Sequence, residues 1–259
     1  MVERSIGVRG SLPTEVVTEL AVAAESAGLH ALWLNVTPRS EALAKAAAAQ
    51  AATERLRIGL GVVPIDREPA GDVAVEAVRL GLDPARVLLG IGSGGAAHPV
   101  ELVRAGIGVL RERCELPIAV GALGPRMRRL ATELGDAVVY NWLTPEAARA
   151  VAADAVRDAA DAGRPRPRTV LYLRTIVDPA ARGALAEEAA RYESFGGYAA
   201  HFERSGYRAL DASLAAVDGL GVPDGIAPYD DDVDEIVIRA ITTDDSAASI
   251  RRVIEATAG

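Results

Sequence analysis

Cysteine, lysine and histidine are all scarce in this chain of 259 residues. Cys114 is the only cysteine, so an internal disulfide and a cysteine-based zinc site are excluded. The three histidines, His30, His98 and His201, are far apart in the sequence, which disfavours a histidine-rich metal cluster. We therefore expect no metal.

Long apolar runs and blocks of basic residues are also missing. The N-terminus has no apolar segment of the kind that signal peptides carry, and no later run is long enough to cross a bilayer. The net charge of -8 repels polyphosphate backbones and anionic lipid surfaces. The sequence therefore predicts a cytoplasmic protein that acts on a small-molecule substrate and binds neither nucleic acid nor a membrane.

Half of the residues are hydrophobic and a quarter are charged, which is typical of a globular protein with a filled interior. Short β-branched runs alternate with longer alanine-rich helical patterns along the whole chain, as in a parallel sheet with crossover helices. The eight predicted strands are Ser5–Arg9, Ala31–Val36, Arg57–Val63, Arg86–Ile91, Ile118–Ala122, Ala137–Trp142, Thr169–Val177 and Glu235–Ile241.

Eight units of roughly regular length favour a closed barrel over an open, doubly wound sheet, which uses the same alternation. The predicted fold class is thus α/β, a (β/α)₈ TIM barrel formed by residues 1–259 as a single domain. A long gap between the last two strands indicates a helical insertion before the final strand. Within it, Ala180–Arg204 and Ala209–Val217 are predicted to be helices, and Gly219–Asp234 an irregular acidic loop.

Local signals mark several helix ends. Thr144-Pro145-Glu146 supplies a capping hydroxyl, a proline at the first helical position and a favourable acid, and Thr37-Pro38 repeats the device. Apolar residues of Val16–Ala27 form one stripe that should pack on the barrel, and Gly28 then ends that helix.

Glycine is concentrated where the third, fourth and fifth strands end. In a barrel these carboxyl ends form the mouth where the site lies, and glycine lets backbone approach a flat ring or a phosphate. Gly124-Pro125-Arg126 then opens a helix whose free N–H groups and arginine could hold a phosphate. The alternative is that each glycine only permits a tight turn between strand and helix.

Gly90-Ile91-Gly92-Ser93-Gly94-Gly95 also fits the GxGxxG pattern of dinucleotide-binding domains. It follows the fourth strand rather than the first, and no acid ends the next strand to bind a ribose hydroxyl. A classical NAD domain is therefore disfavoured.

Several stretches together resemble the luciferase-like monooxygenase superfamily, especially its coenzyme F420-dependent (deazaflavin-dependent) oxidoreductases. The order and spacing of these stretches are those of the superfamily over roughly the first 150 residues. They are Ala24–Trp33, Thr53–Pro64, Arg86–Gly94, Pro117–Ala131 and Gly135–Val139, with a looser similarity at Tyr198–Phe202 and Gly206-Tyr207.

The resemblance implies a (β/α)₈ barrel, often a homodimer, with a deazaflavin or flavin ring over its mouth. Members often have a non-prolyl cis peptide behind that ring, and Gly61-Val62 is the matching position. Trp142 could wall the ring pocket and Asn141 offers an amide for hydrogen bonding. The predicted cofactor-binding residues are Gly61, Val62, Val63, Gly92, Ser93, Gly94, Gly121, Ala122, Leu123, Gly124, Arg126, Asn141 and Trp142.

One departure bears on catalysis. Many deazaflavin-dependent members end the second strand with an acid and a histidine, whereas this chain has Asn35-Val36-Thr37. Asn35 and His98, which follows the glycine loop, are the catalytic candidates, with His98 as a possible general acid. The alternative for His98 is a solvated loop histidine that caps the next helix.

Other conspicuous side chains are predicted to be structural. His201 is interpreted as a helix-surface histidine, Trp33 as a core residue and His30 as a structural residue below the second strand. Asp230-Asp231-Asp232 is interpreted as a solvated acidic face rather than an ion site.

The predicted reaction is hydride transfer between coenzyme F420 or a flavin and a small organic substrate. Two alternatives stay open at this point. One is an FMN-dependent monooxygenase, and the other is a degenerate, non-catalytic barrel that binds a flavin or nothing.

Overall fold

The strands close into a parallel barrel. The computed structural model describes residues 2–36 and 41–259. Each barrel strand pairs in parallel with the next, β6 pairs with β7, and β9 pairs with both β7 and β1. This closure excludes the open sheet. The barrel strands are β1 (Glu3–Arg9), β2 (Ala31–Asn35), β3 (Arg57–Pro64), β4 (Val87–Gly92), β5 (Ile118–Gly121), β6 (Ala137–Asn141), β7 (Arg168–Ile176) and β9 (Glu235–Ala240).

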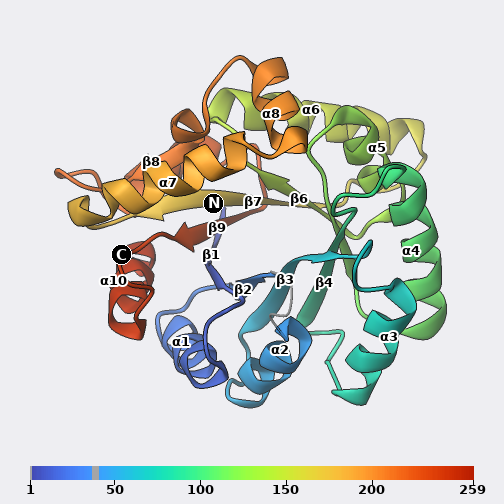
Figure 1. The fold of residues 1–259 in the computed structure, drawn as a ribbon, viewed down its shortest axis with the longest axis horizontal. Helices are drawn as coiled ribbons and strands as arrows, with labels where there is room; N and C mark the ends of the chain where they lie inside the picture. Colours follow the sequence, from blue (N-terminus) through green and yellow to red (C-terminus); the bar gives the residue numbers. More distant parts are fainter. Residues whose placement is uncertain (1, 37–40) are drawn as a thin grey trace.

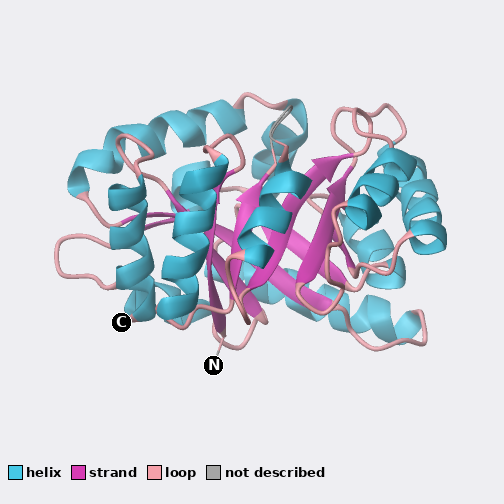
Figure 2. Cartoon of the chain, turned by 90° about the horizontal axis from the view of Figure 1, so that it is seen from below, coloured by secondary structure: helices cyan, strands magenta, loops and turns pink. Residues whose placement is uncertain are grey.

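These are the eight predicted strands, each within two residues of its expected bounds. Their helices surround the strands on the outside (Figure 1) and run alongside them (Figure 2). Among the described residues, no helix is both long and apolar enough to span a membrane. The helices of the ring are α1 (Thr14–Ser26), α2 (Ala42–Ala51), α3 (Ala70–Arg79), α4 (Pro99–Arg113), α5 (Pro125–Leu134), α6 (Pro145–Asp161) and α10 (Ala247–Ala258).

The predicted helix signals are found where the structure describes them. The Thr144 hydroxyl accepts a hydrogen bond from the Ala147 N–H at the start of α6. Four residues of α1, Val17, Leu20, Ala21 and Ala24, are buried against the barrel, and Gly28 follows the helix with a φ of 74°. The Thr37-Pro38 signal lies outside the described residues.

The insertion differs from the prediction in three places. Ala180–Arg204 is not one helix but a short 3₁₀ turn, η1 (Pro179–Ala181), followed by α7 (Arg182–Glu193) and α8 (Gly196–Ser205). Gly219–Asp234 is not wholly irregular, because it contains α9 (Val222–Ile226) and the 3₁₀ turn η3 (Ala227–Tyr229).

The third difference is that the helix predicted for Ala209–Val217 is wrong. This segment forms a 3₁₀ turn, η2 (Ala209–Ala212), and a short strand, β8 (Ser213–Ala215). The reason is an unpaired edge on β7. Pairing of β6 with β7 ends at Tyr172, and β8 pairs with the next part of β7, from Arg174 to Ile176. Backbone groups on that edge therefore override the helical propensity of the segment.

The interior of the barrel is filled from below by Trp33. This core residue was predicted, and its indole is 1% exposed. It lies across Gly59 of β3, where a Cβ atom would come within 2.1 Å of the indole ring. The ring of Tyr172 meets it edge-on, with 5.7 Å between the centroids. Trp33 and Tyr172 therefore form a column between the bottom of the barrel and its mouth.

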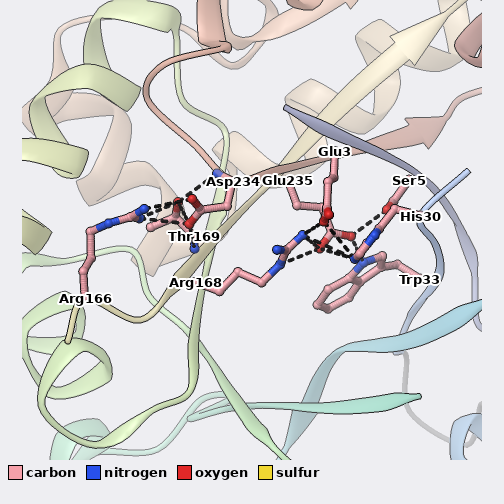
Figure 3. A network of polar contacts seen from close by, with 9 residues as sticks. All are labelled: Glu3, Ser5, His30, Trp33, Arg166, Arg168, Thr169, Asp234 and Glu235. Atoms are coloured by element: carbon pink, nitrogen blue, oxygen red, sulfur yellow. Dashed lines mark hydrogen bonds and ion pairs between the residues drawn. The ribbon is translucent and has the colours of Figure 1, made fainter. Parts of the chain in front are cut away.

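A buried carboxylate ties four strands together at the bottom of the barrel (Figure 3). Glu235, at the start of β9, accepts hydrogen bonds from Ser5 Oγ at 2.6 Å and Trp33 Nε1 at 2.7 Å. Its other oxygen accepts from Arg168 Nη2 at 3.1 Å. Because these partners come from β1, β2 and β7, the carboxylate links both sides of the closing strand.

Glu3, His30 and Glu235 lie within 4.8 Å of one another in this network, a spacing that could hold a metal ion. Arg168, however, forms ion pairs with both carboxylates. His30 Nε2 lies 3.0 Å from Glu3 Oε2. Since Arg168 already pairs with both acids, we interpret the cluster as an ion-pair network that closes the barrel bottom.

Candidate active site

A cavity of about 320 Å³ opens at the carboxyl-terminal mouth of the barrel. Strand ends from β2 to β7 supply most of its wall, and aromatic residues of the insertion supply the rest. A mouth filled by side chains would have supported a degenerate, non-catalytic barrel. The mouth is instead open. Its lining residues are Asn35, Val36, Gly61, Val62, Pro64, Gly92, Ser93, Gly94, Gly121, Ala122, Leu123, Val139, Asn141, Tyr172, Tyr192, Phe195 and Tyr198.

Val62 is a lining residue that packs beside the ends of two neighbouring strands. The peptide bond between Gly61 and Val62 is cis, as the resemblance implies. A Cβ atom on Gly92 would lie 2.7 Å from the Val62 side chain, and one on Gly121 would lie 3.2 Å from it. These two glycines, predicted from the sequence as a cradle for a ligand, therefore also make room for Val62.

The loop after β4 is shaped by Asp66, which follows β3. Gly94 adopts a φ of 55°, in the left-handed region that favours glycine. A Cβ at this position would lie 1.8 Å from the Asp66 carboxylate, which also accepts a hydrogen bond from Gly95 N at 2.9 Å. The acid therefore holds the glycine loop at the edge of the cavity.

Asn35 and Asn141 are the two side-chain amides among the described lining residues, and both have partners in the protein. Asn35 Nδ2 donates to the Gly61 carbonyl at 3.1 Å. Asn141 Nδ2 donates to Tyr198 Oη at 2.9 Å, and its oxygen accepts from Arg174. The predicted position of Asn141 in the cavity is therefore found, and its orientation is determined by neighbours on β7 and α8.

Tyr192, Phe195 and Tyr198 form an aromatic wall that sequence reasoning missed. The Tyr192 and Tyr198 rings meet edge-on at 4.8 Å, and Tyr192 meets Phe195 at 5.6 Å. The chain has ten aromatic residues in all, and five of them lie between positions 192 and 207. This concentration of aromatic residues is the feature of the sequence that could have predicted the wall.

Arg174 lies behind the aromatic wall and is completely buried. Its guanidinium stacks on Trp142 at 4.2 Å and on Tyr192 at 4.7 Å. Nε donates to Glu188 of α7 at 3.3 Å. This stack joins the insertion to β7 and thereby positions the wall.

Trp142 does not line the cavity, contrary to the expectation that it would wall the ring pocket. Its indole is fully buried among insertion residues, including Ala189 and Phe202. The Trp142 carbonyl accepts from Tyr207 Oη at 2.8 Å and lies 3.0 Å from His201 Nε2. His201 is only 3% exposed, so its interpretation as a surface histidine is wrong.

The remaining predicted residues lie around the cavity rather than in its lining. His98 is exposed and makes no side-chain cap at the start of α4. Val63 is buried in the core, and Arg126 is exposed near the start of α5. Arg204 of α8 approaches Gly124, with its Nη2 3.9 Å from where a Cβ on that glycine would lie.

The lining contains no Asp, Glu, His, Lys or Arg among the residues that the structure describes. Tyrosine is the only titratable type there. Burial and the neighbouring Tyr192 raise the pKa of Tyr198 to about 12, although Arg174 and Asn141 oppose the shift. The described part of the lining is therefore a surface of backbone, small apolar groups, amides and phenols.

A closed parallel barrel with such a cavity at its carboxyl mouth defines an α/β-barrel enzyme. The sequence matches the luciferase-like monooxygenase family over residues 5–113 and 103–255. The chain therefore belongs to this family of oxidoreductases and monooxygenases. No curated protein sequence matches it significantly.

Solved structures with both kinds of cofactor are similar in fold. An F420-dependent secondary alcohol dehydrogenase, bound to an F420–acetone adduct, is 16% identical with a TM-score of 0.75, covering 99% of each chain. The F420-dependent tetrahydromethanopterin reductase of Methanopyrus kandleri is 15% identical with a TM-score of 0.78, covering 99% of this chain and 97% of that one.

A third similar structure contains FMN. It is the oxygenating constituent of 3,6-diketocamphane monooxygenase from Pseudomonas putida, 14% identical with a TM-score of 0.72. The coverage is 99% of this chain and 96% of that one. At these identities the similarity establishes the barrel fold, and it is shared by F420 and FMN proteins alike.

Proposed function

We propose that the chain is a cytoplasmic oxidoreductase that moves a hydride between a deazaflavin or flavin ring, bound in the mouth cavity, and a small organic substrate. The observation that carries this proposal is the cavity itself, which is lined by Val62 and by glycine-rich strand ends. Glycine positions leave backbone surface that a flat ring can approach closely. A neutral, partly apolar lining suits such a ring.

Coenzyme F420 is our first choice of cofactor and FMN the alternative. The stretches described above together resemble the superfamily, especially its deazaflavin-dependent members, while solved structures with either cofactor share the fold. Either group, when bound, supplies the carbon or nitrogen centre that carries the hydride.

The residues of the cavity would bind and orient the ring. Val62 offers an apolar contact surface, and Ser93 and Asn141 offer polar groups at two sides. The N-terminus of α5 opens at Gly124 near Arg126 and Arg204, and its free N–H groups suit the anionic tail that both cofactors carry.

Of the two catalytic candidates, Asn35 lies in the cavity lining, where it can orient a ligand. His98 is exposed and outside the lining, so its role as a general acid would require it to move toward the cavity. We therefore propose Asn35 as the nearer of the two to the reacting atoms.

Binding of F420 and FMN to purified protein, followed in parallel by chromophore fluorescence, tests the function. We expect tight, saturable binding of one cofactor, which would identify the redox class. The variant Ser93→Trp places an indole in the cavity and should abolish binding. Ser26→Trp, at the exposed end of α1, is the matched control and should bind normally. Binding of neither cofactor would refute the proposal and favour a non-catalytic barrel.

The resemblance also implies a homodimer, and we propose this oligomeric state for the chain. Sedimentation equilibrium of the purified protein measures its mass in solution. A monomeric wild type would contradict the proposal.

A further inference from the structure

Tyr172 of β7 has a buried hydroxyl with no hydrogen-bond partner in the described structure. The residue is 3% exposed and lines the mouth cavity. The other buried polar side-chain atoms that have no partner among the described residues belong to Arg128, Trp142, Arg174 and Arg239, and none of those four residues lines the cavity. Because buried polar groups are nearly always paired, this hydroxyl calls for an explanation.

No described residue around Tyr172 forms a hydrogen bond with its hydroxyl. Its oxygen lies so close to Gly61 that a Cβ there would come within 2.1 Å of it. The Gly61 carbonyl already accepts from Asn35 Nδ2 at 3.1 Å and from Val36 N at 3.2 Å. The edge-on contact with Trp33 holds the ring in place.

The hydroxyl also stays protonated. Burial raises the pKa of Tyr172 well above its ordinary value, although Arg174 and Arg239 oppose the shift. Glu235 and Tyr192 raise the pKa further. Tyr172 therefore presents a protonated, neutral O–H at neutral pH.

We propose that Tyr172 Oη donates a hydrogen bond to an uncharged carbonyl oxygen of the ligand that fills the mouth cavity. A carbonyl suits the site because the described lining carries no charged side chain that would attract an ionic group. The inference rests on the proposed function and extends it. The carbonyl could belong to the ring of the cofactor or to the substrate, and the test below distinguishes these two sources.

The test compares the wild type with Tyr172→Phe, which keeps the ring and its contact with Trp33 and removes only the hydroxyl. Affinities for F420 and FMN come from fluorescence titration, and the absorption maximum of the bound chromophore is recorded. Acetone serves as the carbonyl probe, with its binding to the cofactor-loaded protein measured by saturation-transfer NMR. Tyr140→Phe is the matched control, because Tyr140 is a buried tyrosine outside the cavity.

If the carbonyl belongs to the cofactor, Tyr172→Phe should bind it about tenfold more weakly and shift its absorption maximum. If the carbonyl belongs to the substrate, cofactor binding should be unchanged and acetone binding should weaken by a similar factor. A lowered carbonyl stretching frequency of the bound ligand in the infrared difference spectrum of the wild type would support the same bond without any substitution.

Equal affinities, spectra and acetone binding in Tyr172→Phe and the wild type would overturn this inference. A trapped water would then satisfy the hydroxyl, and the proposed function would stand. If the wild type itself bound neither cofactor, the proposed function would fail and the inference would fail with it. Any effect of equal size in Tyr140→Phe would also count against a specific role for Tyr172.

Discussion

Residues at the mouth of the barrel that were predicted to bind a ligand also contact neighbouring residues of the protein. At Gly92 and Gly121 a larger residue would crowd Val62, which occupies the space beside both glycines. Asn141, predicted as a hydrogen-bonding group for the cofactor, is already bonded to Arg174 and Tyr198. The residue type therefore identifies the region of the site, whereas the contacts determine which groups are free to bind.

His201 makes stability depend on pH. Burial lowers its pKa below the ordinary value of 6.5, and Arg204 and Arg128 add to the shift, although its contact with the Trp142 carbonyl opposes it. Below about pH 6.5 the unfolded chain therefore binds a proton that the folded chain resists. Stability should be full well above this pH and should fall as the pH drops through it toward 5.

Urea unfolding at several pH values checks this expectation. In His201→Gln the slope of unfolding free energy against pH should become shallower. Part of the slope should remain, because burial also lowers the pKa of His30 despite the nearby Glu235 and Glu3. His98→Gln, which changes an exposed histidine, is the control and should keep the wild-type slope. An unchanged slope in His201→Gln would refute the assignment.

At the scale of elements, α7 is attached to the barrel through one buried acid. Glu188 is 4% exposed and lies among Arg174, Arg239 and Arg191, with Arg9 at 3.7 Å. Although burial opposes ionisation, these arginines hold the pKa of Glu188 below its ordinary value. The charge on this acid compensates two fully buried guanidinium groups.

Glu188→Gln should therefore destabilise the protein by about 3 kcal/mol, because it leaves buried positive charge without a partner. Chemical denaturation of the variant measures the loss, and proteolysis within residues 182–205 should become faster. Glu187→Gln, one residue earlier on the exposed side of α7, should change stability by less than about 0.5 kcal/mol. Similar losses in the two variants would show that the ion cluster does not hold the helix.

The elements also show where sequence reasoning succeeds and fails. The strands were predicted within two residues because consecutive apolar residues, covered on both faces, are visible in the sequence itself. The segment at 209–217 was predicted as a helix from its alanine-rich pattern. Its strand β8 exists only because β7 offers an unpaired edge, which no local pattern reveals.

At the scale of the whole molecule, closure of the barrel depends on the bottom network of Figure 3. Glu235 is 2% exposed and connects β9 with partners on β1, β2 and β7. Glu235→Gln should cost about 3 kcal/mol, since Arg168 loses its buried partner. Because the strands form one continuous sheet, we expect a single unfolding transition at a lower denaturant concentration.

Glu3→Gln is the control for this prediction, because Glu3 contacts the same Arg168 from a position that is 43% exposed at its side chain. Its effect should stay below about 1 kcal/mol, as for other exposed ion pairs. A second transition in Glu235→Gln, or no loss of stability, would contradict the role assigned to the network.

The sequence by itself determined the α/β class, the positions of the strands and the end of the strands at which the cavity opens, whereas closure of the barrel was decided by the pairing of β9 with β1 and β7. The features that the sequence determined follow from local properties, namely apolar runs, glycines at strand ends and capping signals, which act over a few neighbouring residues. Only the tertiary structure decided the course of the insertion, the burial of His201 and Trp142 and the aromatic wall. The same holds for the Tyr172 hydroxyl, which has no hydrogen-bond partner among the described residues, because such a lack depends on all the residues around the side chain in space.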